Sequence, residues 1–174
     1  MVIESIKSEY NRYKSLTDLA IAQVKDEDLH QIIKGTENSI VILLNHLSGN
    51  LKSRFTNFLT EDGEKPWRNR DSEFDGSNQE RTVMLNNWNE AFNILINELN
   101  NLTDEDLSKK VKIRGIELTV SDALARSLSH LSYHVGQIVF IARQLVGKEW
   151  KSLSIPKGES QTYSLNPTKE KKPN

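Results

Sequence analysis

The chain has 174 residues, of which 36% are hydrophobic and 27% are charged, and its formal net charge is −1. This length suits one domain, and the lack of cysteine excludes disulfides, thiolate metal ligands and a cysteine nucleophile. The small net charge gives no sign of broad nucleic-acid binding, and no apolar run approaches the ~18 residues needed to span a membrane. Because its start also lacks a secretory signal pattern, the sequence predicts a cytoplasmic globular protein.

Four segments show the apolar spacing of amphipathic helices: residues 2–24, 37–59, 80–102 and 120–147. Thr36 is the expected N-cap of the second segment, and Thr119 with Asp122 forms a capping-box pattern before the fourth. Gly147 is a suitable stop for the last helix. We therefore expect an all-α fold, a four-helix bundle that occupies residues 1–150.

The segments between and after these helices differ from them in composition. Residues 60–79 contain Gly, Pro, Asp and Asn with little periodicity, which predicts a long loop between the second and third helices. Residues 109–119 alternate in hydrophobicity and turn at Arg114-Gly115, which predicts a small hairpin before the fourth helix. Residues 151–174 contain several prolines and are expected to form an irregular C-terminal tail.

A short sequence echo relates the two halves of the chain. The tetrapeptide DEDL at residues 26–29 recurs at 104–107, and the tripeptide HLS that begins at His46 recurs from His130. Matches this short also arise by chance. If the repeat is real, the second and fourth helices are related by a pseudo-two-fold axis, and His46 and His130 face each other in the core.

Three of the four histidines lie inside apolar helical segments. His130 and His134 are four residues apart, so their side chains share one helix face and can chelate one metal ion. His46 is the natural third ligand. Three imidazoles leave an open coordination position, which is typical of a catalytic rather than a closed structural site. The alternative is three ordinary hydrogen-bonded histidines, since an H-x-x-x-H pair is common by chance.

Other residues are candidates for supporting roles around these histidines. Gln137 lies one turn beyond His134 and could contact either that ring or a substrate. Asn50 lies four residues after His46, the position that His134 takes in the second half, and could also support the site or contact a substrate. The long loop could supply a lid or an anion-binding edge through Trp67, Arg68, Arg70 and Phe74. For each of them a solvated surface position is the alternative, and no pattern identifies a catalytic base or nucleophile.

The histidine segments resemble a known group of proteins. A histidine late in the second helix and the sequence HLSYHVGQI from His130 are similar to the DinB/YfiT-like superfamily of metal-dependent four-helix bundles. The segments DGEKPWRNRD at 62–71 and LSIPKGES at 153–160 resemble one uncharacterised branch of it, known as a domain of unknown function. The resemblance extends over nearly the whole chain.

This resemblance implies a fold and a metal site more than a reaction. It implies that His46, His130 and His134 bind one divalent transition metal, for which zinc, nickel, iron and manganese are all suitable. Related bacterial branches include thiol-dependent S-transferases that act on small electrophiles, so a low-molecular-weight thiol is an implied cofactor. Dimers are common in the superfamily, so a homodimer is expected. A metal-dependent hydrolase and a non-catalytic stress-response or binding module with a structural metal stay open.

Overall fold

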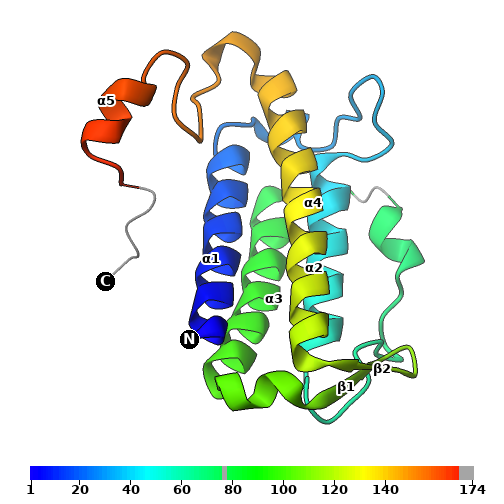
Figure 1. Cartoon of the computed structure of the whole chain (residues 1–174). Helices are drawn as coiled ribbons and strands as arrows, with labels where there is room; N and C mark the ends of the chain where they lie inside the picture. The colour runs from blue at the N-terminus through cyan, green and yellow to red at the C-terminus, as the bar shows by residue number, and fades with distance from the viewer. Residues whose placement is uncertain (76–77, 169–174) are drawn as a thin grey trace.

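The computed structural model describes residues 1–75 and 78–168, so residues 76–77 of the expected loop and 169–174 of the expected tail lie outside the described residues. The described chain is mostly helical and carries a small two-stranded sheet. Four long helices lie side by side: α1 (Val2–Ile21), α2 (Ile40–Phe55), α3 (Arg81–Asn101) and α4 (Val120–Val146) (Figure 1). In the described part, no helix combines the length and apolar character that crossing a membrane requires.

The apolar faces of the long helices form one core. Helix α2 packs mainly on α3, α1 packs on α4, and α2 also contacts α4. Tyr10, Phe55 and Trp88 are fully buried, and the Tyr10 and Phe55 rings meet edge to face with centroids 6.3 Å apart. The Trp88 indole N–H donates to the Asp18 carboxylate at 3.0 Å, so this large ring is buried with its polar atom satisfied. The contact between α2 and α4 places the helices that carry the three histidines beside each other.

Sequence signals predicted three of the helix ends, and the structure agrees with those of α4 but not with the N-cap of α2. The capping box before α4 is confirmed: the Thr119 hydroxyl accepts from the Asp122 N–H, and the Asp122 carboxylate accepts from the Thr119 N–H. Gly147 follows α4 with a φ of 64°. The predicted N-cap of α2 is wrong, because Ser39 caps this helix. The Thr36 hydroxyl is used in the preceding turn, where it donates to a carbonyl oxygen.

The predicted hairpin before α4 is confirmed. Strands β1 (Lys110–Ile113) and β2 (Ile116–Thr119) pair antiparallel. Arg114 and Gly115 join them with φ values of 55° and 75°, the left-handed backbone of a tight two-residue hairpin turn. The Asp62 carboxylate accepts from both of their N–H groups at 2.8 and 2.7 Å, which ties the hairpin to the long loop.

The remaining connections contain short helical turns. The long loop includes the 3-10 helix η2 (Asp71–Phe74), which packs on α2. The two DEDL tetrapeptides both begin 3-10 helices, η1 (Asp26–Asp28) and η3 (Asp104–Ser108), so the echoed sequences adopt the same local structure. After α4 come the 3-10 turn η4 (Gly147–Glu149) and, within the tail expected to be irregular, the short helix α5 (Ser160–Leu165).

Gly136 lies within α4, exposed, and a Cβ added to it would meet no other atom within 4 Å. It therefore does not mark a close approach between helices. Glycine in a helix interior is less favourable than alanine by ~1 kcal/mol, because its backbone loses more conformational freedom on folding. We expect Gly136→Ala to raise the free energy of unfolding by roughly that amount in urea denaturation. A clear loss of stability would contradict the open surroundings described for this position.

Candidate metal centre

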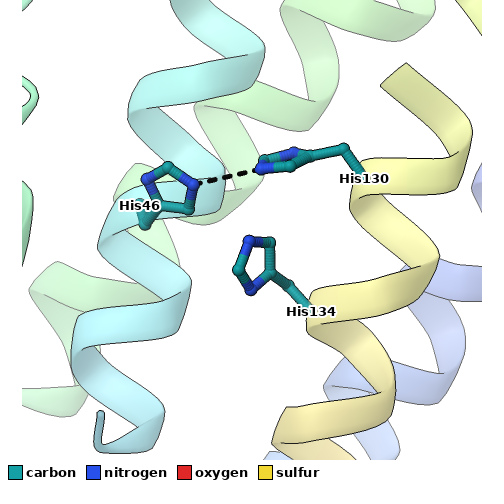
Figure 2. Close-up of side chains that lie close together, drawn as sticks. All are labelled: His46, His130 and His134. Carbon is teal, nitrogen blue, oxygen red and sulfur yellow. Dashed lines mark hydrogen bonds between the residues drawn. The ribbon is translucent and has the colours of Figure 1, made fainter. Parts of the chain in front are cut away.

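Helices α2 and α4 bring three imidazole rings together. His46 comes from α2, while His130 and His134 lie one turn apart on α4, and all three rings occupy the space between the two helices (Figure 2). The Nε2 atoms of His46 and His130 are 3.1 Å apart, and one ligand nitrogen from each ring lies within 4.8 Å of the other two. His46 is buried and the other two are half-buried. The cluster therefore lies at the border between core and surface.

The spacing of these nitrogens suits a common metal ion. Imidazole nitrogens bind zinc-like ions at ~2.0–2.1 Å, so two ligands at octahedral or tetrahedral angles lie roughly 2.8–3.4 Å apart. The 3.1 Å between the Nε2 atoms of His46 and His130 falls in that range. The third ring, His134, also offers a nitrogen within 4.8 Å of the other two. The residues present therefore fit a three-histidine divalent-metal site.

Hydrogen bonds on the far side of two rings decide which nitrogen faces the cluster. Nδ1 of His46 lies 2.9 Å from Oε2 of Glu73, and an ionised carboxylate only accepts, so Nδ1 carries the proton. Nδ1 of His134 lies 2.7 Å from Oε1 of Gln137, an amide oxygen that also accepts. A metal would therefore bind each of these two rings through Nε2. Acceptors of this kind orient the histidine ligands of many metal sites.

Glu73 is the functional residue that sequence reasoning missed. It lies on η2 in the long loop and binds Arg68 through two parallel hydrogen bonds of 2.8 and 2.9 Å. The Arg68 and Glu73 side chains are only 2% and 9% exposed. Burial alone would raise the pKa of Glu73, but the hydrogen bond from His46 and the charge of Arg68 hold that pKa below its ordinary value. Glu73 therefore stays ionised and continues to accept from His46.

Phe74 and Gly49 lie close to the contact between Glu73 and His46. The Phe74 ring packs on the His46 ring with centroids 4.9 Å apart, so η2 covers one side of the cluster. Gly49 lies three residues after His46 on α2, and a Cβ there would come within 2.1 Å of Glu73 Oε1. A glycine one turn after a candidate ligand was the one sequence signal that could have drawn attention to this contact.

Gly49→Ala tests whether the position of Glu73 matters to the site. The added methyl forces the carboxylate away from α2 and weakens its hydrogen bond to His46. Disturbing such an outer partner typically lowers metal affinity about 10–100-fold, and we expect a loss of that size in a competitive chelator titration. Gly136→Ala is the matched control, since it makes the same change in open space. Equal affinities in both variants would contradict a role for Glu73 in holding His46.

Three of the other predicted residues, Asn50, Gln137 and Arg68, lie at the site, whereas Trp67 does not. Asn50 is 9% exposed and lines a cavity together with His46 and His130. Gln137 bonds His134, and Arg68 acts on His46 through Glu73. Trp67 is 58% exposed and does not line that cavity.

The surroundings of His130 favour its neutral form. Burial lowers its pKa from the ordinary 6.5 to about 4, helped by His134, His46 and the charges of Arg68 and Arg54. Burial also lowers the pKa of His134, although its hydrogen bond to Gln137 acts in the opposite direction. Imidazole must be neutral to bind a metal. His130 and His134 therefore favour the metal-binding neutral form at neutral pH before any ion is bound.

These shifts predict acid sensitivity of the metal-free protein. Below pH 6.5 the unfolded chain takes up a proton at residue 130, whereas the folded chain resists protonation down to about pH 4. The unfolded state binds more protons in that window, so the free energy of unfolding falls as the pH is lowered from 6.5 to 4. His130→Gln removes this contribution, so we expect urea denaturation in the presence of a chelator to show a shallower pH dependence. Identical slopes for both proteins would refute the assignment.

A comparison with family models finds one that matches residues 1–159, described as a protein of unknown function (DUF1572). No curated protein matches the chain. No solved structure matches it either.

Proposed function

Because the chain belongs to DUF1572, a family of unknown function, we propose its function from the site itself: it binds one divalent metal ion through His46, His130 and His134. The same proposal assigns the side-by-side arrangement of α1 to α4 to the four-helix bundles of the DinB/YfiT-like superfamily. The observation that carries it is the orientation of two rings. Acceptors on their far sides leave the Nε2 lone pairs of His46 and His134 facing the cluster.

Ordinary hydrogen bonding accounts for this cluster less well. His130 can donate one proton from Nε2 to Nε2 of His46, which satisfies a single lone pair. Nε2 of His134 then has no donor among the described residues. A cation between the rings would instead bind one nitrogen of each of the three histidines together. The arrangement therefore favours a metal over a hydrogen-bonded trio.

Within this proposal the protein is an enzyme that uses a small thiol. Three protein ligands leave room for an exogenous one, and a divalent metal lowers the pKa of a thiol or water that coordinates it. The chain's own residues orient the ligands and shape a cavity of about 340 Å³ beside His46 and His130. We propose that the thiol loses its proton to solvent and that its sulfur then bonds to a small electrophile, whose leaving group departs as the new carbon–sulfur bond forms. A hydrolase that uses water at the same position is the second candidate, since the same open position serves it.

Cobalt(II) substitution tests the thiol reaction and separates it from a structural metal. Titration of the cobalt-loaded protein with cysteine should produce a sulfur-to-cobalt charge-transfer band in the near ultraviolet. Cysteine should produce no such band in the His46→Ala variant. The non-catalytic module predicts a different result: the metal-loaded protein shows no band with thiols, and a chelator strongly destabilises it. A structural metal has this effect because a ligand bound only by the folded state adds RT ln(1 + [L]/Kd) to stability.

The proposal also includes a cytoplasmic homodimer. Tyr133 and Phe140 lie seven residues apart on α4, so they share one helix face, and they are 64% and 54% exposed. This apolar stripe is the surface on which a second copy would pack. Light scattering of the wild type and of a Tyr133→Ser/Phe140→Ser variant tests it: a monomeric wild type would exclude the dimer.

A further inference from the structure

The cavity beside the histidines is built from four separate parts of the chain. Helix α2, the long loop, the hairpin turn and α4 each contribute to its wall, and His46 and His130 form one end. Its volume of about 340 Å³ lies within the size range of small-molecule sites. A ligand in it would therefore lie directly beside the three-histidine cluster.

Positive charge dominates the wall of this cavity. Each of the four parts contributes arginine: Arg54 from α2, Arg68 and Arg70 from the long loop, Arg114 from the hairpin turn and Arg126 from α4. None of the described lining residues is acidic. The whole chain has a net charge of −1, so this accumulation of guanidinium groups is local rather than a consequence of a basic protein.

Nearby carboxylates neutralise only part of this charge. Glu64 pairs with Arg54 at 3.2 Å and with Arg114 at 3.1 Å, so one carboxylate serves two guanidinium groups. Glu73 is committed to Arg68 and His46. Burial lowers the pKa of Arg54, and the neighbouring charges of Arg68 and Arg114 lower it further. The cavity thus retains more positive than negative charge.

Two of the five arginines lack an ion pair in the described part of the chain. Arg70 is exposed and its guanidinium carbon lies 5.5 Å from the centre of the Phe74 ring, while Arg126 is exposed one turn before His130. These donors are available to a ligand without breaking an existing ion pair.

We propose that this arginine-lined cavity binds the anionic group, a carboxylate or phosphate, of a small molecule whose other end reaches the three-histidine cluster. Guanidinium groups suit both anions because their paired N–H groups match two oxygens at once. Contact between the other end of this molecule and the three histidines rests on the proposed metal function. Binding of its anionic group does not need the metal.

Inorganic phosphate and succinate are the probes for this cavity. Each is titrated into the chelator-treated protein and into the nickel-loaded protein, with calorimetry for affinity and NMR of the arginine Nε–H signals for location. Arg126→Gln removes a guanidinium without an ion pair, so the fold should be kept. Arg143→Gln is the matched control, because it removes the same charge from an exposed position of the same helix outside the cavity.

The proposal expects at least one probe to bind at millimolar concentration and to lose about tenfold or more affinity in Arg126→Gln, the effect of one charge-assisted hydrogen bond. Arg143→Gln should bind as the wild type does. No binding of either probe, or equal losses in both variants, would overturn the proposal. A protein that binds nickel but neither probe retains the proposed metal function, and one that binds a probe but no metal retains the cavity alone.

Discussion

Glu73→Ala is expected to lower the free energy of unfolding by about 3–5 kcal/mol, the usual cost of removing one partner from a buried ion pair. The Arg68 side chain is only 2% exposed and both of its described bonds go to Glu73, so its charge would lie buried without a partner. Nδ1 of His46 would lose its acceptor in the same variant. Urea denaturation of the chelator-treated protein measures the loss without any contribution from a metal.

A double variant separates the ion pair from simple packing. Replacing both partners, as Arg68→Met with Glu73→Leu, removes the two charges together while filling similar volumes, and such exchanges are often nearly neutral. The double variant should therefore be more stable than Glu73→Ala alone. If the double variant is the less stable one, the buried charge is not the cause of the loss.

The second large effect is expected from His46→Ala. This variant should lose more metal affinity than the roughly 10–100-fold that is typical when a residue hydrogen-bonded to a ligand is removed. In the proposed site His46 is the ligand that α2 contributes, so its removal leaves only the two rings of α4. A competitive chelator titration with zinc or nickel gives the affinity directly.

The fourth histidine provides the control for this variant. His30 lies in the connection between α1 and α2, is half-buried, and does not belong to the cluster. His30→Ala should keep wild-type affinity. Equal affinity in the His46→Ala and His30→Ala variants would show that α2 contributes no ligand.

Local signals account for what the sequence predicted of the fold. Helix α4 follows a capping box at Thr119 and ends at Gly147, and the hairpin turns at Arg114-Gly115, where the backbone is left-handed. Each of these signals acts within a few residues, so no knowledge of the tertiary structure is needed to recognise it. The N-cap of α2 was misplaced because Thr36 and Ser39 are both good capping residues, and the turn that precedes the helix decides between them.

Sequence signals also indicated the three histidines of the cluster. The four-residue spacing places His130 and His134 on one helix face, and the sequence echo pairs His46 with His130. The structure brings their rings together because α2 packs against α4.

Gln137, one turn beyond His134, could be predicted as a partner from its spacing, but the partner of His46 could not, because it depends on how separate segments dock. Glu73 lies 27 residues from His46, in a loop without periodicity, and reaches it only because η2 packs on α2 beside Gly49. The arginine-lined cavity likewise combines residues from four parts of the chain. The loop arginines alone suggested an anion-binding edge, but no pattern connected them with Arg54, Arg114 or Arg126.

The most direct test of the metal site is the metal content of the untagged protein, measured beside a His130→Ala/His134→Ala variant by elemental analysis. We predict about one equivalent of a transition metal in the wild type, as a single three-histidine site requires, and none in the variant. If neither protein holds metal after incubation with zinc, nickel and manganese, the three histidines are an ordinary hydrogen-bonded cluster and the proposed metal function is wrong.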